Sequence, residues 1–162
     1  MVKVGESFFK AMAVLSAGGR VRNKNWSENA LYVEKESLLN YPVPVFCKKI
    51  KDINGQSVIE RMGWSPSLAD LIGEWEILED ANETLEDTFG YTILQLFDKT
   101  QLKVKHKNWS GEKVIEISEH RITATGEKYY TLHLCDRDTG KKFDYFPTVP
   151  DILRKGWSIL RD

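Results

Sequence analysis

The sequence predicts an α+β fold made of two tandem copies of one small module, each with one helix packed on an antiparallel sheet of about five strands plus a short helix. The first observation behind this prediction is a repeat near the end of each half. Residues 64–75 have a counterpart in residues 145–157, where Asp151 follows Asp70 by 81 positions. The second observation is that each half begins with a helical periodicity and continues with short β-rich runs.

A second pair of segments repeats in the same order. The pair Asn25-Trp26 recurs as Asn108-Trp109, 83 positions later, and a basic strand precedes it in both places. Two matches at nearly the same spacing favour a duplicated small domain, because the units of solenoid proteins are shorter. We therefore expect a first module at residues 1–80 and a second, diverged copy at residues 81–162.

The first module begins with an amphipathic pattern that predicts a helix over residues 5–17. Phe8, Met12 and Leu15 follow the i, i+4, i+7 spacing of one helix face, and two glycines then stop the pattern. The β-rich runs after it predict five strands. These strands are expected at residues 21–26, 31–35, 45–52, 56–62 and 75–78.

Turn and cap residues predict how these elements are joined. Two prolines make residues 41–44 an extended connection, because proline has no N–H to give to a sheet. Asn54-Gly55 lies between two β-rich runs and predicts a hairpin turn there. Residues 66–72 are expected to form the short helix, with Ser65 as its cap and Pro66 at its first position.

The second module is expected to repeat this order. Phe89, Ile93 and Leu96 share one side of a helix predicted over residues 86–98. Strands are expected at residues 102–109, 113–118, 129–135, 141–146 and 157–160, and the short helix at residues 151–154. The third and fourth of these strands form a hairpin that turns at Gly140.

Composition and charge exclude several classes of protein. The chain has 23 basic and 24 acidic residues, and neither half is basic, so bulk charge gives no support for nucleic-acid binding. No run approaches the ~18 apolar residues of a membrane span, and the start of the sequence lacks a signal-peptide pattern. Cys47 and Cys135 stand at non-corresponding spacings, so we expect two buried free thiols. We expect a cytoplasmic protein.

Several kinds of catalytic and metal site are missing from the sequence. The three histidines have no metal-ligand spacing, and no Cys-x-x-Cys or nucleophile motif occurs, so we expect no metal, no cofactor and no enzymatic activity. Asp70 and Asp151 can act as paired carboxylates. Their simpler interpretation is electrostatic, because each lies at the start of a short helix, where the dipole favours an anion.

A basic strand beside a tryptophan is the chemistry that both halves do offer. Arg20, Arg22 and Lys24 alternate before Trp26, and a lysine run alternates in the same way before Trp109. Cations and an indole on one face suit a nucleotide, whose phosphate meets the charges and whose base stacks on the ring. The alternative is that both tryptophans anchor the core beside a solvated charged stripe. The candidate ligand-binding residues are Arg22, Lys24, Asn25, Trp26, Asp70, Lys105, Asn108 and Trp109.

The first half resembles a known protein family. The helical run at residues 9–15, the segment Gly19-Arg20-Val21-Arg22 with Trp26, and the closing run from Trp64 to Glu76 are similar to the small phage proteins of the second Thoeris anti-defence type. The resemblance covers residues 5–79, and the second half resembles a diverged member.

The resemblance implies a function without catalysis. Members of this family are sponges that form oligomers and sequester glycocyclic ADP-ribose signals, and some hold cyclic dinucleotides. Their pockets form between protomers, so a tandem chain would supply in one polypeptide what a homodimer supplies in two. By this resemblance, Arg22 and Trp26 would bind the ligand in the first half, and Lys105 and Trp109 in the second.

Two other functions remain open from the sequence. The alternating basic strands and the cluster at residues 48–51 also suit a small phage-encoded DNA-binding protein that modifies transcription or compacts DNA. A third interpretation is an interaction module that offers its sheet edges to a partner protein.

Overall fold

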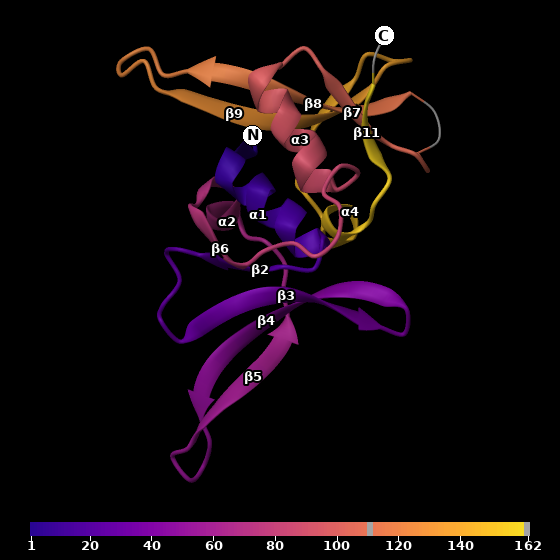
Figure 1. Ribbon diagram of the computed structural model, residues 1–162. Coiled ribbons are helices and arrows are strands. Elements are labelled where there is room, and N and C mark those ends of the chain that lie inside the picture. Colours follow the sequence, from indigo (N-terminus) through magenta and orange to yellow (C-terminus); the bar gives the residue numbers. More distant parts are fainter. Residues whose placement is uncertain (110–111, 161–162) are drawn as a thin grey trace.

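A computed structural model describes residues 1–109 and 112–160 and has an α+β fold with two antiparallel sheets (Figure 1). Within these ranges there are four helices, and strands account for 44% of the chain against 20% for helices. The prediction of an α+β fold with antiparallel sheets is therefore confirmed. Residues 161 and 162, the end of the second predicted module, lie outside the described ranges.

The two halves have the same order of helices and strands once the first short strand is set aside. The first half consists of β1 (Lys3–Val4), α1 (Glu6–Ser16), β2 (Arg20–Asn23), β3 (Ala30–Leu38), β4 (Tyr41–Lys51), β5 (Ser57–Gly63), α2 (Leu68–Ile72) and β6 (Trp75–Glu79). The second half consists of α3 (Phe89–Asp98), β7 (Lys103–His106), β8 (Lys113–Arg121), β9 (Lys128–Asp136), β10 (Lys142–Asp144), α4 (Val149–Leu153) and β11 (Trp157–Leu160).

The two sheets also have the same strand order. The first sheet runs β5-β4-β3-β2-β6, and the second runs β10-β9-β8-β7-β11. The second sheet has one further strand, because β1 pairs antiparallel with β9 through Lys3–Thr131 and Val4–Tyr130. This short strand was not predicted. It ties the start of the first half to the sheet of the second.

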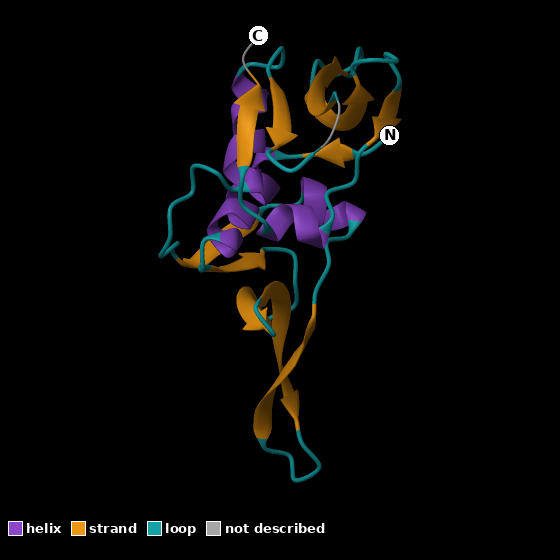
Figure 2. Ribbon diagram, turned by 90° about the vertical axis from the view of Figure 1, so that its right-hand side faces the viewer, coloured by secondary structure: helices purple, strands orange, loops and turns teal. Residues whose placement is uncertain are grey.

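Helices α1 and α3 pack against each other between the two sheets (Figures 1 and 2). Their backbones approach so closely at Gly90 that a Cβ atom there would lie 2.2 Å from the Phe9 carbonyl oxygen. Buried residues of both helices and both sheets form one hydrophobic cluster, in which Phe9 contacts Phe89 edge to face. The two halves therefore share a core, and the β4–β5 hairpin extends away from it (Figure 2).

Several predicted element boundaries differ from the structure: the strand predicted over residues 102–109 is β7, which ends at His106, and the helix predicted over residues 86–98 begins at Phe89. Two further errors have identifiable reasons. The strand predicted over residues 21–26 ends at Asn23, because the chain turns there and the Trp26 N–H donates to the Asn23 carbonyl at 3.1 Å. The connection predicted over residues 41–44 belongs to β4, where Pro42 and Pro44 pair with β3. Prolines are tolerated at this point because β5 pairs with β4 only from Val45 onward, which leaves the other edge open.

The short helix α2 begins later than predicted. Its cap is Ser67 rather than Ser65: the Ser67 hydroxyl accepts from the Asp70 N–H, and the Asp70 carboxylate accepts from the Ser67 N–H. This reciprocal pair is a capping box, in which the aspartate takes the place that glutamate or glutamine usually fills. The hairpin predicted at Asn54-Gly55 is present, and Gly55 provides its left-handed residue with φ of 76°.

Candidate functional site

A row of side chains that face one another across the first sheet leads from the core to the surface. Val21 pairs with Val33, Val33 with Phe46, and Phe46 with Met62, so all four lie on the face that carries α1. The two valines are fully buried, whereas Met62 is 42% exposed. The core face therefore continues past the helix and ends at a surface of large apolar side chains.

Tryptophans close this end of the sheet. The ring of Trp26 packs edge to face on Phe46, with ring centres 5.1 Å apart, and on Trp75 at 5.2 Å. Trp64 packs on the other side of Trp75 at 5.8 Å. Trp26 and Trp64 are half-buried, so parts of both rings stay available to a ligand.

An open cavity of about 350 Å³ lies between these rings and the start of α2. We call it the first cavity; its lining residues are Trp26, Phe46, Met62, Gly63, Trp64, Ser65, Ser67 and Asp70. The Asp70 side chain is held there by two uncharged donors, the Asn23 amide at 2.9 Å and the Ser67 N–H at 2.9 Å. The cavity thus combines aromatic surface with a buried carboxylate.

A second open cavity, of about 340 Å³, occupies the corresponding place in the other half. Its lining residues are Asn108, Trp109, Lys113, Leu134, Tyr145 and Asp151. Four of these stand where the first cavity has Trp26, Phe46, Trp64 and Asp70, as the strand register and the repeat spacing show. Local contacts also repeat: the Trp109 N–H donates to the His106 carbonyl at 3.0 Å, as Trp26 does to Asn23.

The carboxylate of the second cavity has different partners. One oxygen of Asp151 accepts from the Tyr145 hydroxyl, and the other accepts from the Arg154 guanidinium at 2.6 Å. Burial and the Asp151 charge raise the pKa of the Tyr145 phenol far above its ordinary value. Tyr145 is therefore a hydrogen-bond donor at all physiological pH values, not a base.

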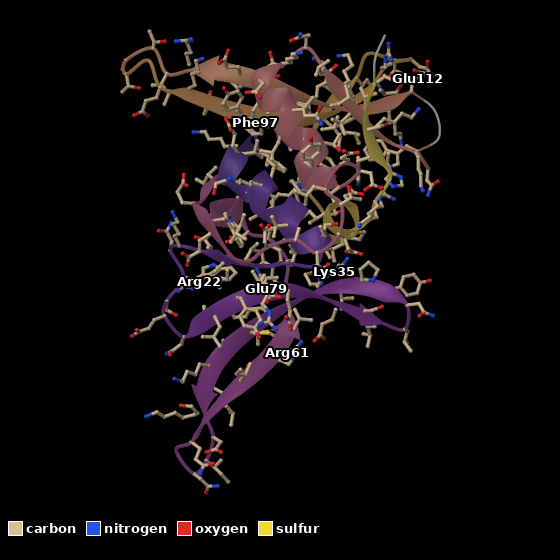
Figure 3. All side chains as sticks on the ribbon, in the orientation of Figure 1. Arg22, Lys35, Arg61, Glu79, Phe97 and Glu112 are labelled. Carbon is tan, nitrogen blue, oxygen red and sulfur yellow. The ribbon has the colours of Figure 1, made fainter. Side chains whose placement is uncertain are left out.

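Arg22, a predicted ligand-binding residue, is engaged with the protein itself. The Arg22 side chain is labelled in Figure 3. Its guanidinium donates to the backbone carbonyls of Ala30 at 2.8 Å, Trp26 at 2.9 Å and Ser27 at 2.7 Å. It also contacts the Glu76 carboxylate at 3.4 Å. Arg22 fixes the turn that carries Trp26, and it is not among the residues that line the first cavity.

In the first half, the predicted cationic face beside an indole is not formed. Because β2 ends at Asn23, Trp26 does not continue the alternation and packs on the core face, next to Phe46. Arg20 lies on the outer face, where Glu34 accepts from its guanidinium at 2.8 Å. Arg20 and the Trp26 ring therefore lie on opposite faces of the sheet, whereas the sequence pattern predicted one shared face.

The remaining predicted residues divide between the cavities and the surrounding turns. Lys24 and Asn25 are exposed in the turn after β2, and the Asn25 N–H donates to the Asn23 side chain at 2.9 Å. Asn108 lines the second cavity together with Trp109. Lys105 lies on β7 opposite Ser158 and is not part of that lining. Of the eight predicted residues, four line a cavity: Trp26, Asp70, Asn108 and Trp109.

The outer face of each sheet carries a cluster that sequence reasoning missed. In the first sheet, Glu34 accepts from Arg20 at 2.8 Å and from Arg61 at 2.9 Å, beside the buried Cys47. In the second sheet, Glu116 takes the same place between Lys103 and Lys142, beside Cys135.

The two cysteines therefore correspond, contrary to the prediction from spacing. Phe46, beside Cys47, pairs with Val33, and Leu134, beside Cys135, pairs with Ile115. The hairpin between these strands is longer in the second half, so the offset between the halves rises from 82 residues at Val33 and Ile115 to 88 residues at the cysteines. Both thiols are buried and free, as expected.

Burial and ion pairing shift two pKa values in the second cluster. Burial disfavours the charged form of Glu116, but the hydrogen bonds from Lys103, Cys135 and Lys142 outweigh it and lower the pKa of Glu116 to about 2. Burial and the Glu116 carboxylate raise the pKa of the Cys135 thiol to about 11. The thiol stays protonated and unreactive at neutral pH.

Residues 1–109 and 112–160 contain no group of three or more His, Cys, Asp or Glu side chains that could hold a metal ion. Within the same ranges, no helix is both long enough and apolar enough to cross a membrane. In comparisons with known proteins, the chain matches no family model, no curated protein and no solved structure.

Proposed function

We propose that this chain is a non-enzymatic binding protein that sequesters a small ligand with a nucleobase, such as a cyclic nucleotide or a cyclic ADP-ribose-type signal. The observation that carries the proposal is the occurrence of one kind of cavity at the same place in both halves, lined by a half-buried tryptophan and by an aspartate, which is buried in the first half and partly exposed in the second. An indole offers a stacking surface for a base, and a carboxylate accepts the N–H groups of its edge.

We infer further that the two halves arose by tandem duplication of one module. Support comes from the shared order of helices and strands, the shared strand order of the two sheets, and the corresponding contacts of Trp26 and Trp109. In this proposal the chain carries both sites of a dimer in one polypeptide. It acts in the cytoplasm of an infected cell, as the resemblance to phage anti-defence proteins implies.

The polar groups of the cavities favour binding over catalysis. The Asp70 carboxylate is occupied by the helix cap and by Asn23, and the Asp151 carboxylate by Tyr145 and Arg154. A carboxylate held in this way is poorly placed to take a proton from a substrate. The raised pKa of Tyr145 removes the other candidate base.

The DNA-binding alternative receives less support. Its motivation is the alternating basic strands and the basic cluster at residues 48–51. On the strands, Arg20, Arg22 and Lys103 are each engaged with a carboxylate, and in the cluster Lys48 lies 3.5 Å from the Glu60 carboxylate. A cation that is already paired releases fewer counterions from DNA, and it contributes less affinity.

The experiment that tests the proposal is calorimetric titration of the purified protein with cyclic ADP-ribose isomers and cyclic dinucleotides. We expect binding in the micromolar range or tighter for one member of this panel. Replacing both cavity tryptophans, Trp26→Leu and Trp109→Leu, should weaken binding by about 10–100-fold per site, since base stacking is worth about 1–3 kcal/mol. The matched control is Tyr41→Leu, an aromatic residue that is 74% exposed and lies outside both cavities.

A second measurement identifies the natural ligand. Protein purified from infected cells is heat-denatured, and the released small molecules are analysed by mass spectrometry. Absence of any bound nucleotide in this experiment, together with absence of binding across the calorimetric panel, would refute the proposal.

A further inference from the structure

We propose that the two cavities select ligands of different charge: the first takes an uncharged group that donates hydrogen bonds, and the second takes an anionic group such as a phosphate. This inference rests on the proposed function and concerns what distinguishes its two sites. It follows from the hydrogen-bond partners of the two aspartates and from two substitutions between corresponding residues in the two halves.

The first cavity holds a carboxylate whose charge no cation balances. Asp70 is only 6% exposed, and its two hydrogen bonds come from the Asn23 amide and the Ser67 N–H, both uncharged. No ion pair among residues 1–109 and 112–160 includes Asp70. Each oxygen retains a lone pair for a ligand N–H, whereas a phosphate brought next to this buried charge would be repelled.

The carboxylate of the second cavity is balanced by Arg154, a cation that is not among the residues lining the cavity. Arg154 donates to Asp151 at 2.6 Å, and the Tyr145 hydroxyl occupies the other oxygen. Lys113 adds a further cation at the exposed rim, and its ammonium group forms no ion pair among the described residues. The side chains of Asp151, Arg154 and Lys113 together carry one net positive charge, which suits an oxyanion.

Substitutions between the halves explain why the two aspartates differ. The first half has Asn23 where the second has His106, and Asn23 reaches Asp70. The His106 ring instead hydrogen-bonds the Lys155 carbonyl at 2.7 Å and accepts from the Asn108 N–H at 3.1 Å. This leaves Asp151 without an amide partner.

Arg154 is a hydrogen-bond partner of Asp151 because of a second substitution. Arg154 stands where the first half has Gly73, 81 positions earlier, and its guanidinium lies over the Trp157 ring at 5.4 Å. At Gly73 a Cβ atom would lie 2.9 Å from the Asn23 side chain, so no larger residue fits there while Asn23 holds Asp70. The packing around each aspartate therefore determines whether its charge is balanced by a cation.

The experiment compares adenosine with adenosine 5′-monophosphate, two probes that differ only in the phosphate. In calorimetry with the full chain, we expect adenosine to bind one site and its affinity to change little with salt. The monophosphate should bind the other site, and its affinity should fall as ionic strength rises from 50 to 300 mM, because the contact is between charges.

Variants assign each probe to its cavity. Asp70→Asn should weaken adenosine about tenfold and leave the monophosphate unchanged. Lys113→Gln should weaken the monophosphate about fivefold and leave adenosine unchanged, and Arg154→Gln should do the same. The matched control is Lys49→Gln, an exposed lysine on β4 outside both cavities. Asp70→Asn alters the α2 cap, and thermal unfolding shows whether this variant remains folded. If it does not, the test rests on Lys113→Gln.

Two results would overturn the inference in distinguishable ways. If both probes bind both cavities equally, or if each variant weakens both probes alike, the charge selectivity is wrong and the proposed function stands. If neither probe binds at millimolar concentration while the cyclic ligands do, the cavities recognise the whole ligand rather than its charge, and the inference also fails. If neither the two probes nor the cyclic ligands bind, both the charge selectivity and the proposed function are wrong.

Discussion

Glu116 shows at the scale of one residue how charge stabilises this fold. It accepts from Lys103 and Lys142 on the outer face of the second sheet, and these contacts keep its pKa near 2. A carboxyl group whose pKa is lower in the folded than in the unfolded state stabilises the fold above the unfolded value. That stability is lost as the pH falls from about 4.5 to about 2.

We predict that Glu116→Gln removes the part of the pH dependence of the unfolding free energy that comes from Glu116. One pKa unit corresponds to about 1.4 kcal/mol, so the shift of Glu116 contributes up to about 3 kcal/mol to the free energy of unfolding at neutral pH. Urea unfolding of both proteins between pH 6 and pH 2 measures it. The control is Glu127→Gln, an exposed glutamate in the β8–β9 turn, which should retain the wild-type dependence. Parallel loss of stability in wild type and Glu116→Gln would contradict the assignment.

The sequence identified the aromatic residues of the candidate site better than its charged residues. Trp26 and Trp109 line their cavities, because a large ring in the turn after a short strand can only pack back onto the core face. Arg22 was assigned to a ligand, whereas it clamps the turn through three carbonyls. The assignment rested on strand alternation, and the alternation stops at Asn23. The end of a four-residue strand depends on tertiary contacts that a local pattern does not contain.

At the scale of elements, the contact between α1 and α3 depends on one glycine. Gly90 lies in the first turn of α3, where any Cβ would meet the Phe9 carbonyl at 2.2 Å and the Ala13 nitrogen at 2.5 Å. These are backbone atoms of α1, so they cannot move aside as a flexible side chain can. The helices would have to separate.

We predict that Gly90→Ala lowers the free energy of unfolding by about 3 kcal/mol, although alanine favours helix by about 1 kcal/mol. Urea denaturation measures the change. Gly63→Ala is the matched control, because nothing lies within 4 Å of a Cβ atom at that position, and it should change stability by less than about 0.5 kcal/mol. A Gly90→Ala protein as stable as wild type would mean that the two helices are not packed this closely.

Most elements were predictable because their signals are local. Both long helices have a periodic apolar face, and the closing strands begin at Trp75 and Trp157 as expected. The signals that failed concern partners distant in sequence. The sequence does not show that β5 leaves the edge beside Pro42 and Pro44 open, or that β1 pairs with β9. Pairing across more than a hundred residues leaves no local pattern.

At the scale of the whole molecule, the two halves behave as one unit. A single hydrophobic cluster contains Phe9 from one half and Phe89 from the other, and helices of both halves separate the sheets. The sequence predicts two modules; the structure shows one order of helices and strands in both halves and a core to which both halves contribute. No pattern in the sequence indicates that the two long helices pack against each other.

We predict a single cooperative unfolding transition for the full chain, since neither half can unfold without exposing the apolar surface of the other. Differential scanning calorimetry should give equal calorimetric and van't Hoff enthalpies. Two separated transitions, or a calorimetric enthalpy well above the van't Hoff value, would show that the halves are energetically independent.

The pairing of β1 with β9 has a consequence for how the protein is made. A ribosome releases Lys3 and Val4 long before it polymerises Tyr130 and Thr131, their hydrogen-bond partners. During translation the strands of the first sheet, β2 to β6, are made before β9, so β1 remains an unpaired strand until β9 follows. Nascent chains stalled before β9 therefore carry an exposed strand, and synthesis of β9 is the step that provides its partner.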